Sequence, residues 1–249
     1  MRNHFLIVVP VYNAEKYIEK CLLSILTQTY KNYTLVVVDD CSTDKTTEII
    51  NSIYRKHKNF KVHTNEKRIH SPLGNFVKGI QLCPGSPEDI IVTVDGDDWL
   101  YGNDVLAYLN IVYQNPEIWL TYGSFTSVSK RTEKYCYPIR IIQTYRRKGS
   151  WRTSHLRTLK RKLFVQIDDI DLRDTTTGEY YTHYSDAAYM YPAIEMAGFL
   201  HSKFIKKILY VYNDENPWCQ LEDISVADTH KEMRHEIKAR TIYPRVESL

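Results

Sequence analysis

The sequence predicts an α/β protein with a doubly wound, mainly parallel central sheet flanked by helices, followed by a helical C-terminal extension. In the first half, short apolar runs typical of strands covered on both faces alternate with stretches whose apolar residues recur three and four positions apart, as in helices. This order implies parallel strands joined by right-handed crossovers. The chain of 249 residues, 43% of them hydrophobic, is long enough to bury a sizeable core.

The strands of the first half are expected at residues 5–11, 33–38, 61–63 and 90–94. Helices are expected between them, at 14–28, from a Ser42 or Thr43 cap to about 57, and at 72–83 behind Ser71, since hydroxyl side chains cap helix N-termini. The second half is less regular. There we expect helices at 103–114, 185–197 and 226–240 and strands at 119–124 and 208–212.

Composition narrows the class of protein. The net charge of +3 gives no reason to expect a nucleic-acid partner. The five cysteines are scattered without a CxxC pair, which disfavours a disulfide framework and favours a reducing compartment such as the cytoplasm. No apolar run approaches the roughly 18–20 residues of a membrane span. We therefore expect no transmembrane segment, and attachment to a membrane surface stays open.

The strongest chemical signal is Asp95-Gly96-Asp97-Asp98, directly after an expected buried strand. Three carboxylates within four residues repel one another, and a divalent cation would relieve the repulsion. Oxygen ligands suit Mg²⁺ or Mn²⁺, which also bind phosphate oxygens. Gly96 allows a tight turn or a close approach of the backbone. The alternative is a solvated acidic turn at a helix N-terminus.

Polar residues also follow the first two strands. Pro10 and Tyr12 could form a wall for stacking, and Asp39-Asp40 could accept hydrogen bonds from a base or a ribose. The alternatives are an ordinary strand-to-helix turn and an acidic helix cap. Ligands of such sheets bind beyond the carboxyl ends of the strands, so these clusters and the acidic triplet should line one crevice. The chain lacks GxGxxG and GxxxxGK[ST] loops, which disfavours dinucleotide-binding and P-loop domains.

Four segments resemble motifs of the family 2 glycosyltransferases with the GT-A fold, in the family's order. They read VVPVYNAE at 8–15, SILTQTY at 24–30, VVDDCSTD at 37–44 and VDGDDWL, which contains the DxD motif, at 94–100. The resemblance covers residues 4–125 well. It implies an inverting, metal-dependent hexosyltransferase that uses Mn²⁺ or Mg²⁺. Such an enzyme moves a sugar from a UDP-sugar to a hydroxyl of a glycan, a lipid-linked or a protein-linked acceptor.

The resemblance also implies residue roles. Pro10, Tyr12 and Asp40 would hold uracil with Asp39 nearby, and Asp95 would lie by the ribose. Asp97 and Asp98 would bind or orient the metal. The family's usual basic residue before Asn75 is missing, and Lys67 or Arg68 is expected to replace it. The remaining residues that we assign to nucleotide-sugar binding flank these positions: Val11, Asn13, Glu15, Asn75 and Gly96.

The catalytic base is expected in the second half. Residues 184–189 resemble the family segment in which an aspartate starts a helix, and this points to Asp186. An apolar helix face follows it, and partial burial raises the pKa of a carboxyl group and makes it a better base. A helix cap is the alternative, and Glu179 is the second candidate.

Trp151 and His155 are weaker candidates for the acceptor site, with a core tryptophan and a structural histidine as the alternatives. They lie within a basic stretch, residues 146–162, most of which we interpret as a solvated helix face; contact with a diphosphate or an acidic acceptor is the alternative. His230 or His235 could add a metal ligand.

We expect a GT-A domain at residues 1–212, with a nucleotide-sugar-binding half at 1–100 and an acceptor half at 101–212. Residues 213–249 are expected to pack on it as an extension. Two other functions are alternatives: a sugar-nucleotide-binding module without a base, and a phosphotransferase of the haloacid-dehalogenase type. The second is disfavoured because its nucleophilic aspartate follows the first strand, whereas the acidic triplet lies mid-chain.

Overall fold

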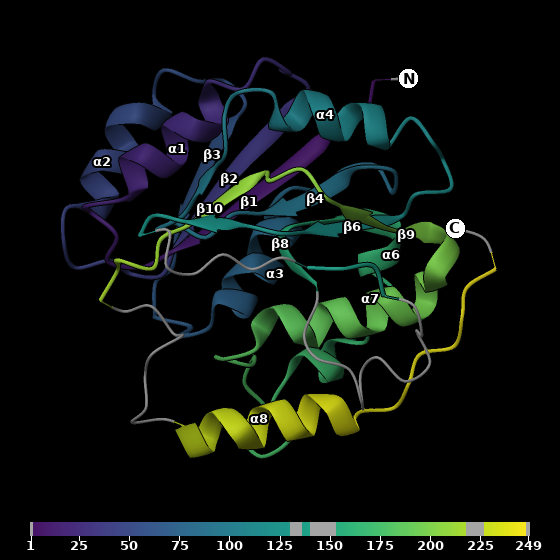
Figure 1. Cartoon of the computed structure of the whole chain (residues 1–249). Helices are drawn as coiled ribbons and strands as arrows, with labels where there is room; N and C mark the ends of the chain where they lie inside the picture. The colour runs from purple at the N-terminus through teal and green to yellow at the C-terminus, as the bar shows by residue number, and fades with distance from the viewer. Residues whose placement is uncertain (1, 130–135, 140–152, 218–226, 248–249) are drawn as a thin grey trace.

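The computed structural model describes residues 2–129, 136–139, 153–217 and 227–247 (Figure 1). A central sheet of seven strands has the order β3-β2-β1-β4-β8-β6-β9. Neighbouring strands are parallel except at β8, which is antiparallel to both β4 and β6. The doubly wound, mainly parallel sheet expected from the sequence is thereby confirmed. The strand bounds are β1 Phe5–Val11, β2 Tyr33–Asp39, β3 Phe60–Thr64, β4 Ile90–Thr93, β6 Leu120–Gly123, β8 Ser154–Lys160 and β9 Ser202–Ile205.

Helices cover both faces of the sheet (Figure 1). One face carries α1 (Ile18–Leu26), α2 (Thr46–Tyr54) and α4 (Val105–Val112). The other carries α3 (Pro72–Leu82), α6 (Arg161–Phe164) and α7 (Ser185–His201), with the 3₁₀ turn η1 (Asp169–Leu172) and α8 (Ala227–Ala239) beyond. A small second sheet has the order β5 (Trp99–Leu100), β10 (Tyr210–Tyr212), β7 (Thr126–Ser127).

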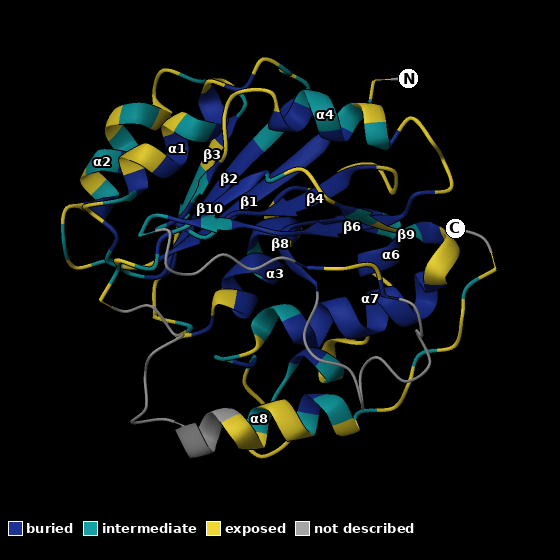
Figure 2. Cartoon of the chain, in the orientation of Figure 1, coloured by how far each residue is buried: buried dark blue, intermediate teal, exposed yellow. Residues whose placement is uncertain are grey.

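Strand β1 explains why the central strands read as unbroken apolar runs. Phe5, Ile7 and Val9 belong to the core cluster under α1 and α4, whereas Leu6 and Val8 belong to the cluster under α3 and α7. Since successive side chains of a strand point to opposite faces, both faces of β1 must be apolar. Figure 2 shows the sheet buried between its two helical layers.

The helix starts agree only in part with the sequence. Ser71 caps α3 as expected, because its hydroxyl accepts a hydrogen bond from the Gly74 backbone at 3.0 Å. The Ser42 or Thr43 cap is wrong, since α2 begins at Thr46 and the Thr46 backbone donates to the Asp44 carboxylate at 2.9 Å.

The basic stretch is the main correction. Residues 154–160 form the buried strand β8 in the middle of the sheet, and not part of a solvated helix face. Its backbone pairs with β4 and β6 on its two sides. Arg157, Lys160 and Arg161 are accordingly buried. Residues 146–152 lie outside the described ranges.

Helix α8 packs beyond α7 and η1. Its Ile237 belongs to the core cluster of that face, and its Glu236 accepts a hydrogen bond from the Tyr181 hydroxyl at 2.6 Å. Within the described residues, no helix is both long and apolar enough to cross a membrane.

Candidate functional site

The predicted polar clusters meet at the carboxyl ends of β1, β2 and β4. The Val11 carbonyl accepts from the Asp40 backbone at 2.9 Å, and the Pro10 carbonyl accepts from the Gly96 backbone at 3.2 Å. A Cβ on Gly96 would lie 2.7 Å from the Val11 Cβ, which is closer than real carbon atoms approach. Glycine is therefore required for the acidic triplet to pack against β1.

Asp39 is fully buried and shapes the loop after β2. Its Oδ1 accepts from the Ser42 backbone at 3.0 Å and from the Ser42 hydroxyl at 2.5 Å, and its Oδ2 accepts from the Thr47 hydroxyl at 2.5 Å. These contacts give Asp39 a role inside the loop.

Asn13 and Glu15 join this loop to the one after β1. The side-chain Oδ1 of Asn13 accepts from the Thr43 backbone at 2.8 Å, and the Glu15 carboxylate accepts from the Lys45 backbone at 3.0 Å. The contacts hold the two loops at a fixed separation beneath Tyr12.

Asp40 is only 2% exposed and lies at the centre of a second network. Its Oδ1 accepts from Asn65 Nδ2 at 2.8 Å and from the Ile69 backbone at 2.7 Å, and its Oδ2 accepts from the His70 backbone at 2.9 Å. Asn65 also donates to the Asn75 side chain at 2.7 Å, so Asn75 lies buried behind Asp40.

Tyr12 and Arg68 provide the exposed surface above Asp40. The Arg68 guanidinium carbon is 3.4 Å from the centroid of the Tyr12 ring, and its Nε is 3.8 Å from Asp40 Oδ2. Tyr12 is 36% exposed, which leaves an aromatic surface at the sheet edge. Lys67 is exposed beside them. The structure thus brings together an aromatic ring, a carboxylate and a cation from three predicted segments.

The acidic triplet contacts β10 and the segment after it. Asp98 is 1% exposed; its Oδ2 accepts from the Tyr210 hydroxyl and its Oδ1 from the Asn213 backbone, both at 2.7 Å. Asp97 Oδ2 accepts from Asn216 Nδ2 at 2.6 Å. Asn213 and Asn216 therefore belong to the surroundings of the acidic triplet.

The three carboxyl groups are crowded electrostatically. Burial raises the pKa of Asp98 well above its usual range, and the charges of Asp97 and Asp95 raise it further. Burial also raises the pKa of Asp97. For Asp95, burial raises the pKa to about 6, although the nearby Arg157 cation opposes the shift. A bound divalent cation would stabilise the charged forms, so this set of donors fits Mg²⁺ or Mn²⁺.

A histidine from β8 completes a possible ligand group. Single ligand atoms of Asp95, Asp98 and His155 all lie within 4.8 Å of one another. The sequence had paired Asp97 with Asp98 and had placed His155 at the acceptor. His155 is 8% exposed, and its ring stacks on Tyr210 with centroids 4.3 Å apart. Trp151 and the His230 side chain lie outside what the structure describes, and His235 is exposed on α8.

Asp186 lies at the start of α7 and faces a buried arginine. Its Oδ2 accepts from Arg157 Nη1 at 2.7 Å, and its Oδ1 accepts from the Ala187 backbone at 2.9 Å. The side chain is 25% exposed. Glu179, the second candidate, is exposed on a loop.

Arg157 is a site residue that the sequence did not single out. It is 5% exposed and its Nη2 lies 3.1 Å from His155 Nδ1. The signal was present as His155 and Arg157 two positions apart, which places them on one face of a strand. The helical interpretation of this stretch concealed it.

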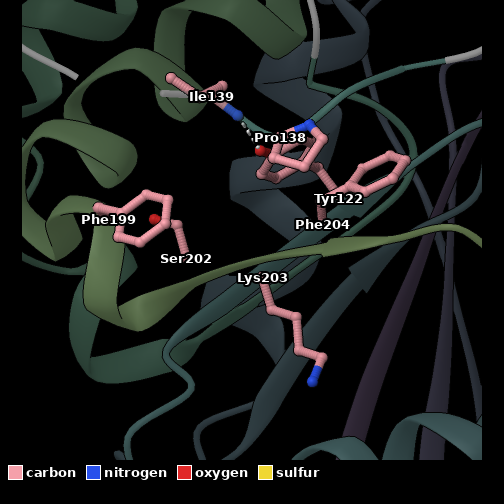
Figure 3. Close-up of a pocket in the computed structure, with 7 residues that line it drawn as sticks. All are labelled: Tyr122, Pro138, Ile139, Phe199, Ser202, Lys203 and Phe204. Carbon is pink, nitrogen blue, oxygen red and sulfur yellow. Dashed lines mark hydrogen bonds between the residues drawn. The ribbon is translucent and has the colours of Figure 1, made fainter. Parts of the chain in front are cut away.

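A pocket of about 210 Å³ lies elsewhere, where the end of α7 meets β6 and β9 (Figure 3). Its lining contains none of the predicted site residues: Tyr122, Pro138, Ile139, Phe199, Ser202, Lys203 and Phe204. The chemistry described above is therefore separate from this pocket.

Residues 6–171 match the family model described as glycosyl transferase family 2. An uncharacterized glycosyltransferase of Haemophilus influenzae is 37% identical over 122 residues, which span 48% of this chain and 46% of that protein. TarS of Staphylococcus aureus, a poly(ribitol-phosphate) β-N-acetylglucosaminyltransferase, is 36% identical over 98 residues, 39% of this chain and 16% of TarS. The matches span less than half the length of these relatives.

Solved structures agree on the fold. The crystal structure of S. aureus TarS 1–349 in complex with UDP superposes with a TM-score of 0.62 at 23% identity, covering 84% of this chain and 60% of that chain. A mannosyltransferase from Pyrobaculum calidifontis in complex with GDP-Man and Mn²⁺ gives a TM-score of 0.57 at 19% identity, covering 85% and 57%. With the family model matching well over half of its residues, the chain belongs to glycosyl transferase family 2 and has the GT-A fold.

Proposed function

We propose that this chain transfers a hexose or related sugar from a UDP-sugar to a hydroxyl acceptor, with inversion at the anomeric carbon. The observation that carries the proposal is the meeting of Tyr12, Asp40 and the acidic triplet at one sheet edge, with Asp186 linked to the same cluster through Arg157. A UDP donor is supported by the TarS structures, which hold UDP and UDP-GlcNAc.

The nucleotide would bind over Tyr12 and Asp40. The exposed Tyr12 ring offers a face for uracil, and a lone pair of the Asp40 carboxylate can accept from the uracil N3–H. Arg68 now covers the Tyr12 ring at 3.4 Å. Donor binding would therefore move Arg68 off the ring, where its charge could meet the diphosphate.

The triplet would hold Mn²⁺ or Mg²⁺ through Asp97 and Asp98, with Asp95 and His155 as further donors. When bound, such an ion supplies Lewis-acid stabilisation of the leaving diphosphate. The structurally similar mannosyltransferase of P. calidifontis has a solved structure that contains Mn²⁺. The chain's own contribution is to keep the carboxylates close together through the Tyr210 and Asn213 contacts with Asp98.

Asp186 would act as the general base. One of its oxygens takes the proton of the acceptor hydroxyl while the acceptor oxygen bonds to the anomeric carbon and the bond from that carbon to the diphosphate breaks. Each carboxylate oxygen accepts one hydrogen bond and keeps a lone pair for this purpose. We further propose that the domain includes the start of the expected extension, because Asn213 and Asn216 contact the triplet.

The direct test is UDP release from a panel of UDP-sugars, with GDP-mannose as a control, with and without glycan, glycolipid and polyol-phosphate acceptors. The proposal expects acceptor-stimulated UDP release that requires Mn²⁺ or Mg²⁺. Tight UDP binding with no turnover on any acceptor would instead support a non-catalytic sugar-nucleotide-binding module.

A further inference from the structure

We propose that Arg157 is a positioning residue that holds the Asp186 carboxylate in its reactive orientation. The inference rests on the proposed role of Asp186 as the base. It adds a residue from the middle of the central sheet to a site otherwise built from loops and helix ends.

The geometry fixes the Asp186 carboxylate at both oxygens. Arg157 Nη1 donates to Oδ2 at 2.7 Å, and the Ala187 backbone donates to Oδ1 at 2.9 Å. Two hydrogen bonds, one to each oxygen, restrict rotation of the carboxylate plane. A base must be aligned with the proton it removes, and a misplacement of about 1 Å can cost about a hundredfold in rate.

The position of Arg157 is itself fixed by its strand and by a neighbouring histidine. It projects from β8, which is hydrogen-bonded on both sides, and its Nη2 lies 3.1 Å from His155 Nδ1. His155 in turn stacks on Tyr210, whose hydroxyl binds Asp98. One chain of contacts therefore links Asp186 to the acidic triplet, and it fixes where the base lies relative to the leaving group.

The burial of Arg157 is poorly explained by stability alone. Its Nε is buried and has no hydrogen-bond partner among the described residues. A buried charge with an unpaired donor is weak evidence for a stabilising role, because an apolar side chain of similar volume could fill the site without desolvating an ion. Lysine would keep the charge but could not reach both Asp186 and His155, since it lacks the planar fork of arginine.

The test is a double-mutant cycle between Arg157→Lys and Asp186→Asn, followed by kcat, KM for the donor and UDP binding. We expect Arg157→Lys to lower kcat by about tenfold to a hundredfold with donor KM and UDP affinity nearly unchanged. In the Asp186→Asn background the same change should lower kcat by less than about twofold, because its effect acts through the base.

Arg161→Lys is the matched control. Arg161 is also a buried arginine of this region, and its Nη2 donates to the Cys83 carbonyl at 2.7 Å, away from the acidic cluster. This variant should lose stability and keep its kcat. Arg157→Gln serves as a second variant with the same expectations as Arg157→Lys.

Several outcomes would overturn the inference. Additive effects of Arg157→Lys and Asp186→Asn, an unchanged kcat, or loss of the fold in both Arg157 variants would each show that Arg157 does not act through Asp186. A fully active Asp186→Asn variant would instead refute the base itself, which separates failure of the proposed function from failure of this inference.

Discussion

Two groups of carboxylates lie at the sheet edge on either side of β1, and their charges are balanced in different ways. Asp39 and Asp40, after β2, accept hydrogen bonds from hydroxyls, backbone amides and an asparagine side chain, and these donors surround both oxygens of each group. Asp95, Asp97 and Asp98, after β4, lie close to one another, and burial raises the pKa of each.

The contrast distinguishes carboxylates with a structural role in the site from carboxylates that we expect to bind a cation. The first group takes most of its hydrogen bonds from the protein and fixes the loops around Tyr12, and Asp40 Oδ2, which accepts one hydrogen bond from the His70 backbone, keeps a lone pair for uracil. The second group carries negative charge that the protein only partly offsets, through Arg157 near Asp95 and through the hydrogen bonds to Asp97 and Asp98. A bound cation would stabilise the charged carboxylates of the second group, as neutral hydrogen-bond donors already stabilise those of the first group.

Asp186 belongs to neither group, and replacing it should have the largest effect. Asp186→Asn keeps the size of the side chain and removes proton abstraction, so kcat should fall by about a hundredfold or more. Donor affinity should persist, because the proposed nucleotide contacts lie at Tyr12 and Asp40. Steady-state kinetics and calorimetry with UDP measure the two effects. Near-native transfer would exclude Asp186 and direct attention to Glu179.

Asp39→Ala tests the first group. Removing a carboxylate that accepts from Ser42 and Thr47 leaves buried donors unpaired, and this should lower the free energy of unfolding by about 2–4 kcal/mol. Urea denaturation measures the loss, and Mn²⁺ should not restore it. A stable Asp39→Ala variant that lacks UDP binding would show that Asp39 contacts the ligand directly.

Asp97→Asn tests the second group and should have the opposite sign. Because the pKa of Asp97 is raised in the fold, its charged form opposes folding at pH values above that pKa. The metal-free variant should therefore melt about 2–4 °C above the metal-free wild type, the scale of a change of about 1 kcal/mol. The difference should shrink as the pH falls through the raised pKa. A lower melting temperature would contradict the electrostatic account.

A separate prediction concerns the base of the nucleotide. A carboxylate at Asp40 can accept from uracil N3–H, whereas cytosine presents an acceptor at N3. UDP should bind at least about tenfold more tightly than CDP, a difference of roughly 1.4 kcal/mol. Competition calorimetry decides the point, and equal affinities would remove Asp40 as the group that recognises uracil.

The first half of the fold could be predicted because each of its elements shows its own local pattern. The residues of β1 are apolar on both faces of the sheet, and Ser71-Pro72 predicts the start of α3. The neighbouring carboxylates are also visible locally as Asp39-Asp40 and the acidic triplet. The different surroundings of these carboxylates cannot be seen in the local sequence, since the donors to Asp40 come from the Asn65–His70 loop.

The second half was harder because its residues depend on distant partners. Strand β8 carries Arg157 and Lys160 in a buried strand, which local patterning assigns to a surface. The pairing with Asp186, 29 positions away, helps to offset the cost of burying the arginine there. Likewise, Asn213 and Asn216 meet the triplet across more than a hundred residues, which no local signal predicts.

The most direct test of the contrast is the affinity for UDP measured by calorimetry with Mn²⁺ and with EDTA. Wild type should bind UDP at least about tenfold more tightly with Mn²⁺, a gain of roughly 1.4 kcal/mol. Asp97→Asn should lose this gain and keep its fold, while the control Asp104→Asn, at an exposed residue paired with Lys207, should behave as wild type. Equal UDP affinity of the wild type with Mn²⁺ and with EDTA would contradict the assignment of the acidic triplet as a cation site.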